Sequence, residues 1–259
     1  MPKHTEAYLQ ILDCVRRAGR LMLKEEEPEI AVKGANDFVT ARDREIQDFL
    51  IRELSRLFPR AFFIAEEKEN FELPDTEGFI IDPIDGTTNF MNSFPCCAVC
   101  VARVRNRQLV DSFIYNPFRE EMFTAEAGQG AWLNEQPIHT VSRPPSRAIC
   151  LIEDSWKADR IVLRSYFASA RCIGSAELGI AYVACGRADI FFEYSLSPWD
   201  YAAGKLLVLE AGGVFTLMNQ QNDELDFSHS AAVFAANPTC AADALEIIQS
   251  DYREWVQSQ

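Results

Sequence analysis

The residues best suited to chemistry lie in segment 78–90, which reads Gly-Phe-Ile-Ile-Asp-Pro-Ile-Asp-Gly-Thr-Thr-Asn-Phe. Its apolar first half predicts a buried strand. Pro83 cannot donate to a strand ladder, so we expect the strand to end at Asp82. Asp85 follows three residues later, and Gly86 begins a tight turn into a short helix. Two carboxylates beside free backbone N–H groups predict a site for a hard cation and an anion, as phosphate-ester chemistry requires.

Two other acidic residues stand at comparable positions. Glu66 follows the apolar run 61–64, and Asp200 stands at the start of a predicted helix. Each acid taken alone could be an ordinary solvated charge, and Asp200 could interact only with the dipole of its helix. Glu66 and Asp82, however, would end strands that lie about 4.8 Å apart if they are neighbours in a sheet. There the two carboxylates would repel each other unless a cation lay between them.

The available donor atoms indicate which cation this would be. The chain has three histidines, and none has the spacing of a metal ligand, which disfavours zinc. An all-oxygen donor set favours Mg²⁺, with Mn²⁺ as an alternative. Calcium suits a phosphate site less well, and the sequence lacks the regular acidic loops of a calcium-binding module.

The cysteines have a plain structural interpretation. Cys97-x-x-Cys100 matches a redox or zinc half-site, but the apolar residues around it predict a buried strand. Side chains alternate along a strand, so these two thiols should point to opposite faces of the sheet and pack in the core. We expect all eight cysteines to be reduced, in a cytoplasmic protein.

The overall composition restricts the partners. The 259 residues carry a formal net charge of −14, which disfavours nucleic acid and anionic membranes as principal partners. The first residues show no apolar leader, and no apolar run approaches the roughly 20 residues that span a bilayer. The same negative charge would repel an anionic substrate unless bound cations made the site locally positive.

The elements that must position these residues follow from hydrophobic periodicity. Helical spacing predicts amphipathic helices over 8–22 and 46–58, and β-rich segments fill 96–125. Gly128-x-Gly130 lacks the third glycine of a dinucleotide fingerprint, so we interpret it as a turn between strands. Strands and helices then alternate, with strands expected at 149–152, 172–173, 189–193, near 214 and at 232–235, and helices at 156–168, 175–185 and 200–210.

The linker-like segment 142–146 divides these elements into two predicted domains. Residues 1–145 would form an α+β domain that carries most of the acidic ligands. Residues 146–259 would form an α/β domain that carries Asp200 and the substrate contacts. A site formed by both domains would lie in the cleft between them.

Several segments resemble the inositol monophosphatase family, of the magnesium-dependent, lithium-sensitive phosphatase superfamily. Segment 80–90 is similar to the family's first signature, and segments 199–204 and 210–213 are similar to its second. Segments 33–43, 63–67, 174–176 and 191–193 resemble further family segments in the same order along the chain. The resemblance implies a mixed α+β and α/β fold, a layered αβαβα sandwich of the sugar-phosphatase type, in a protein that is usually a homodimer.

The resemblance also implies roles for individual residues. Two or three Mg²⁺ ions would be held by Glu66, Asp82, the backbone carbonyl of Ile84, Asp85 and Asp200. Asp43 and Thr87 would orient and deprotonate the attacking water. The N–H groups of Gly86 and Thr87 would receive the phosphate. Contacts to the rest of the substrate would come from Asp85, Gly174, Ser175, Ala176 and Glu193.

The activity implied is a metal-dependent phosphomonoesterase that acts on a small polyol or sugar phosphate by in-line attack of an activated water. Inositol 1-phosphate is the favoured substrate, because Glu193 can accept hydroxyl groups. The alternatives within the family are fructose 1,6-bisphosphate, histidinol phosphate and a 3′-phosphonucleotide. A non-catalytic interaction protein that keeps the fold is the alternative from another class. Ala65 and Asn92 depart from the family's usual glycine and histidine.

Overall fold

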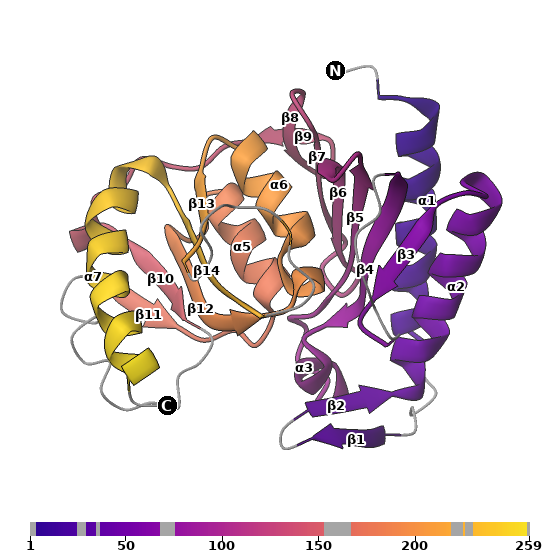
Figure 1. The fold of residues 1–259 in the computed structure, drawn as a ribbon, viewed down its shortest axis with the longest axis horizontal. Helices are drawn as coiled ribbons and strands as arrows, with labels where there is room; N and C mark the ends of the chain where they lie inside the picture. The colour runs from indigo at the N-terminus through magenta and orange to yellow at the C-terminus, as the bar shows by residue number, and fades with distance from the viewer. Residues whose placement is uncertain are drawn as a thin grey trace.

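The computed structural model describes residues 4–24, 30–34, 37–67, 76–152, 167–218, 225 and 230–257. Helices α1 (Glu6–Met22) and α2 (Ala41–Leu57) cover the outer face of a seven-stranded sheet. Helices α5 (Ala176–Ala184) and α6 (Ala202–Glu210) lie between this sheet and a five-stranded sheet, whose far face α7 (Pro238–Gln257) covers (Figure 1). The predicted αβαβα layering is therefore confirmed.

The seven-stranded sheet has the order β3-β4-β5-β6-β7-β8-β9. Its strands are β3 (Phe62–Ala65), β4 (Glu77–Asp85), β5 (Ala98–Arg105), β6 (Gln108–Asn116), β7 (Glu121–Glu126), β8 (Gly130–Leu133) and β9 (Gln136–Ile138). β3 and β4 are parallel and all other neighbours are antiparallel. The turn predicted at Gly128-x-Gly130 is confirmed, because it joins the hairpin of β7 and β8.

The prediction that Pro83 ends its strand is wrong, since β4 continues to Asp85. The pairing with β5 shifts between Asp82, which faces Cys100, and Asp85, which faces Ala98. This shift is a β-bulge, which leaves one residue of the bulged strand outside the ladder and so tolerates a proline. Both aspartates therefore stay on one strand.

The five-stranded sheet has the order β11-β10-β12-β14-β13. Its strands are β10 (Ile149–Ile152), β11 (Ser169–Arg171), β12 (Ile190–Leu196), β13 (Val214–Leu217) and β14 (Ala231–Ala236). The strand predicted at 172–173 is wrong, because β11 ends at Arg171, where its pairing with β10 ends. Most of the helix predicted over 156–168 lies outside the described residues.

Smaller elements complete the chain. They are the two-stranded sheet of β1 (Ile30–Gly34) and β2 (Asp37–Thr40), the short helix α3 (Thr87–Met91) and the 3₁₀ helices η1 (Pro145–Arg147) and η2 (Pro198–Asp200). η2 takes the place of the first turn predicted for the helix over 200–210. The domain boundary at 145/146 stays a prediction.

The buried apolar residues form three clusters: one under α1 and α2, one between the two sheets around α5 and α6, and one under α7. Cys97 packs with residues of α1 and α2, whereas Cys100 packs with residues of α5 and α6, so the two thiols face opposite sides as predicted. All eight cysteines are free. Within the described part of the chain, no helix is both long enough and apolar enough to cross a membrane.

Candidate active site

The parallel pairing of β3 and β4 brings Glu66 and Asp82 together. Ala65 lies opposite Ile81, and the backbone N–H of Glu66 donates to the Ile81 carbonyl at 3.2 Å. η2 packs against β4 and brings Asp200 to the same place. Burial raises the pKa of Asp82, and the negative charges of Glu66, Asp85 and Asp200 raise it further. Four predicted ligands from three different elements thus form one acidic cluster.

Asp82 provides the test of whether a cation fits this cluster. Its side chain is 2 % exposed, and Oδ1 is buried without any hydrogen-bond partner. An unpartnered carboxylate oxygen inside a protein is costly, because it has lost its hydration and gained nothing in exchange. Among the described residues, no three of these acids have side chains arranged closely enough to hold a metal ion as they stand. The fit therefore rests on the unpartnered oxygen and on the concentration of like charge, both of which a bound cation would relieve.

Asp85 has a second role besides its place in the acidic cluster. Its carboxylate accepts hydrogen bonds from the Ser175 hydroxyl and from the backbone N–H groups of Ala176 and Glu177, the latter two at 3.0 Å. These are donors at the start of α5, which the helix itself leaves unsatisfied. Asp85 therefore caps α5 from β4 of the seven-stranded sheet, and it holds two of the predicted substrate contacts in place.

The predicted pair of Asp43 and Thr87 is brought together. The Thr87 hydroxyl lies 3.3 Å from Asp43 Oδ1 and 3.1 Å from the carbonyl oxygen of Ile84. Asp43 is fully buried in the first turn of α2, where it forms a capping box with Thr40. Burial raises the pKa of Asp43, and hydrogen bonds from Thr40 partly offset this. The hydroxyl thus stands between a buried carboxylate and the carbonyl that is expected to bind metal.

The turn at Gly86 requires glycine. Its φ of 85° lies in the left-handed region, and a Cβ there would come within 2.9 Å of the Gly174 carbonyl oxygen. Asn89 ties the same two loops together, since its side-chain amide donates to the carbonyls of Ile173 and Cys96 at 2.7 Å. α3 and the loop at 173–174 consequently hold a fixed relative position beside the acidic cluster.

Glu193 completes the set of predicted residues. It lies on β12 with 8 % of its surface exposed, and its carboxylate accepts the N–H of Tyr194 at 2.8 Å. Its negative charge contributes to the raised pKa of Asp200, after burial and the charges of Glu66 and Asp85. Glu193 therefore lies near the acidic cluster on the side of the five-stranded sheet.

Comparison with known proteins agrees with this geometry. Residues 5–252 match the model of the inositol monophosphatase family. The chain belongs to this family. It is 34% identical over 254 residues to the inositol-1-monophosphatase of Mesorhizobium japonicum, covering 92% of this chain and 94% of the relative. It is 40% identical over 215 residues to the Nus factor SuhB of Escherichia coli K12, covering 77% of this chain and 80% of that protein. The solved structure of an IMPase from Thermotoga maritima has a TM-score of 0.85 and 28% identity, and the match covers 95% of this chain and 97% of that one.

Sequence reasoning missed one buried residue beside the site of this family member. Glu177 is completely buried in α5, next to Asp85. Its carboxylate oxygens accept the backbone N–H groups of Ala203 and Gly204 at 3.0 and 2.6 Å. The signal was present in the sequence, because Glu177 is the only charged residue in the otherwise apolar helix Ala176–Ala184.

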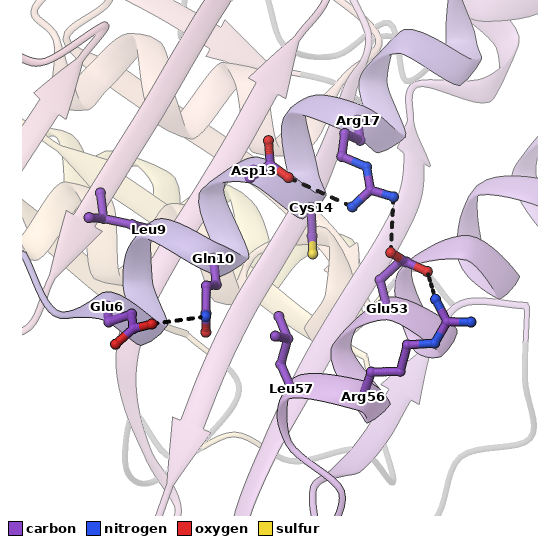
Figure 2. Close-up of a pocket in the computed structure, with 9 residues that line it drawn as sticks. All are labelled: Glu6, Leu9, Gln10, Asp13, Cys14, Arg17, Glu53, Arg56 and Leu57. Atoms are coloured by element: carbon purple, nitrogen blue, oxygen red, sulfur yellow. Dashed lines mark hydrogen bonds and ion pairs between the residues drawn. The ribbon is translucent and has the colours of Figure 1, made fainter.

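The groove between α1 and α2 is separate from the acidic cluster. Figure 2 shows this groove of about 370 Å³, where Arg17 bridges Asp13 and Glu53 above the Cys14 thiol. It lies on the outer face of the seven-stranded sheet, and none of the predicted site residues lines it. The candidate active site of this family member is therefore the acidic cluster between the two sheets.

Proposed function

We propose that this chain is a magnesium-dependent phosphomonoesterase that hydrolyses a small polyol or sugar phosphate, with inositol 1-phosphate as the favoured substrate. The observation that carries the proposal is the buried, unpartnered oxygen of Asp82 among three further carboxylates. The match to a relative named inositol-1-monophosphatase over 92% of this chain supports the choice of substrate.

Mg²⁺, or Mn²⁺ in its place, would be held by carboxylate side chains and one backbone carbonyl. The proposed ligands are Glu66, Asp82, the carbonyl of Ile84, Asp85 and Asp200. Two or three bound ions would neutralise the charge of the carboxylates, lower the pKa of a bound water and stabilise the oxygen of the leaving alcohol. They would also make the site attractive to an anion in a chain of net charge −14.

Thr87 and Asp43 would orient the attacking water. The Thr87 hydroxyl can donate to Asp43 or to the Ile84 carbonyl while its own lone pairs accept from a water. The buried carboxylate of Asp43 is then the group to which the proton of that water can move. The chain itself forms no covalent bond to phosphorus in this proposal.

The remaining residues would hold the substrate. The N–H groups of Gly86 and Thr87 are the proposed position of the phosphate. Gly174, Ser175, Ala176 and Glu193 are the proposed contacts to the alcohol, with the Glu193 carboxylate as acceptor for hydroxyl groups. The homodimer that the family resemblance implies and the cytoplasmic location expected from the cysteines remain predictions.

Release of inorganic phosphate tests this function. Purified protein should hydrolyse inositol 1-phosphate when Mg²⁺ is present and should lose this activity in EDTA. Fructose 1,6-bisphosphate, histidinol phosphate and a 3′-phosphonucleotide belong in the same panel, and the highest kcat/KM identifies the substrate. No Mg²⁺-dependent turnover on any phosphomonoester would refute the enzyme proposal.

One observation favours a second function of a different class. The chain is 40% identical over 215 residues to a protein named Nus factor SuhB, so a role as a non-catalytic subunit of a larger assembly is the other candidate. The net charge of −14 favours a protein partner over direct binding of nucleic acid. An Asp85→Asn variant that has no phosphatase activity but still replaces the wild-type protein in cells would support this second function.

A further inference from the structure

Glu177 connects Asp85 with the start of α6, the helix that follows Asp200. The main chain of this residue donates its N–H to Asp85 Oδ2 at 3.0 Å. Its side chain accepts from the first turn of α6, from Ala203 at 3.0 Å and from Gly204 at 2.6 Å. α6 begins two residues after Asp200. Glu177 thus contacts Asp85, a proposed ligand on the seven-stranded sheet, and the first turn of α6, which directly follows the segment that carries Asp200.

The approach of α5 to α6 is built around this contact. A Cβ on Gly204 would come within 2.7 Å of Glu177 Oε2 and within 2.7 Å of Ile180 Cγ2. Only glycine allows the helix start to come so close to the carboxylate. On the other side of the same turn, the Ser112 hydroxyl of β6 donates to the Ala203 carbonyl at 2.7 Å. The first turn of α6 is therefore held from both the middle layer and the seven-stranded sheet.

Glutamate is an unusual residue for satisfying two backbone N–H groups in a buried place. Glu177 is completely buried, and no basic side chain of the described residues forms an ion pair with it. Burial raises the pKa of Glu177, and the negative charges of Asp85 and Asp200 raise it further. A neutral serine or asparagine is the usual cap of a helix start and would avoid this repulsion. The contacts of Glu177 with Asp85 and with the turn that follows Asp200 connect this buried residue to the proposed metal site.

We propose that Glu177 is a positioning residue of the metal site, which sets the location of Asp200 relative to Asp85. This inference rests on the proposed function, because it requires that these carboxylates bind Mg²⁺. Glu177 itself is not a ligand, since both of its oxygens are directed to backbone N–H groups.

The test compares Mg²⁺ binding with stability in matched variants. Glu177→Gln keeps the size of the side chain but replaces one acceptor oxygen with a donor, and Glu177→Ala removes both acceptors. Glu121→Gln is the control, since Glu121 is another buried carboxylate, bound by Arg187, which lies just past the end of α5. Isothermal titration calorimetry with MgCl₂ on the metal-free proteins gives the dissociation constant. The melting temperature in EDTA gives the stability.

We expect both Glu177 variants to bind Mg²⁺ about tenfold more weakly than the wild type, the size typical of partners that orient metal ligands. The Glu121 control should lose stability and keep the wild-type Mg²⁺ affinity. In phosphate release, the Glu177 variants should need about tenfold more Mg²⁺ for half-maximal rate, at an unchanged KM for the substrate.

Two results would overturn the inference. One is wild-type Mg²⁺ affinity in both Glu177 variants. The other is failure of both to fold while the control folds, which would make Glu177 a purely structural residue. A wild type that binds Mg²⁺ but hydrolyses no phosphomonoester refutes the proposed function and leaves the positioning role intact. A wild type that binds no Mg²⁺ refutes both.

Discussion

The carboxylate of Asp85 accepts the backbone N–H of Ala176 at 3.0 Å, across 91 residues of chain. This bond joins the end of β4 to the start of α5, and it gives one aspartate two tasks. Asp85 is a proposed metal ligand, and it is also the cap that holds the loop of proposed substrate contacts. The loss of this carboxylate should consequently affect both chemistry and stability.

We expect Asp85→Asn to lower kcat on the order of a hundredfold or more, because the amide binds a divalent cation poorly. An amide has only one acceptor oxygen, so one of the two hydrogen bonds from the N–H groups of α5 is lost. The variant should therefore also lose about 1 kcal/mol of unfolding free energy. Phosphate release and urea unfolding measure the two effects. Ser175→Ala is the control that removes one donor to Asp85 without changing its charge. An Asp85→Asn enzyme with wild-type turnover would rule out the ligand assignment.

Thr87→Val should lower kcat about a hundredfold, because the hydroxyl between Asp43 and the Ile84 carbonyl is lost while the shape of the side chain is kept. Thr87→Ser keeps the hydroxyl and should retain most of the activity. The measurement is kcat for inositol 1-phosphate at saturating Mg²⁺. Equal activity of the valine and serine variants would show that the hydroxyl takes no part in the reaction.

Cys97→Ser should change stability and leave catalysis unaltered. The Cys97 side chain is fully buried among apolar residues, and a hydroxyl there would lose its hydration at a cost of about 1–3 kcal/mol. Thermal unfolding and kcat are the measurements, with the exposed thiol of Cys172 as the site for the control Cys172→Ser. A selective loss of activity in Cys97→Ser at an unchanged melting temperature would contradict the core assignment.

The ion pair of Glu121 and Arg187 should make stability depend on pH. Burial acts to raise the pKa of Glu121, but the hydrogen bonds and charges of Arg187 and Arg119 outweigh it, so the pKa lies below its usual value of 4.5. A lowered pKa in the folded state means that the pair stabilises the protein above pH 4.5 and that this stabilisation is lost as the pH falls further.

We therefore expect the difference in unfolding free energy between wild type and Glu121→Gln to be constant from about pH 6 to 8 and to shrink as the pH falls below about 4.5. Urea unfolding of both proteins at several pH values measures it. A difference that does not change with pH would show that the carboxylate has no charge-dependent role in the fold.

The sequence alone predicted which residues could do this chemistry, and it predicted the strand faces of Cys97 and Cys100. The periodicity around Cys97 and Cys100 predicted their opposite orientations, because side-chain direction on a strand is a local property of the backbone. The acidic residues that follow apolar runs predicted a cation site, because their position relative to a strand is also a local property of the sequence. The match to a known family signature in segment 80–90 supplied the roles, and those roles remain to be tested.

The tertiary structure decided how the acids are held. Pro83 stays within β4 because a bulge against β5 removes the need for its N–H, and local propensity contains no information about the partner strand. The capping of α5 by Asp85 and of α6 by Glu177 likewise depends on backbone groups that are remote in sequence. Every residue except proline can supply such an N–H group, so no side-chain pattern reveals which one will be nearby. That is why the sequence predicted Asp85 as a ligand, and only the folded chain showed that Asp85 and Glu177 connect the seven-stranded sheet to α5 and α5 to α6.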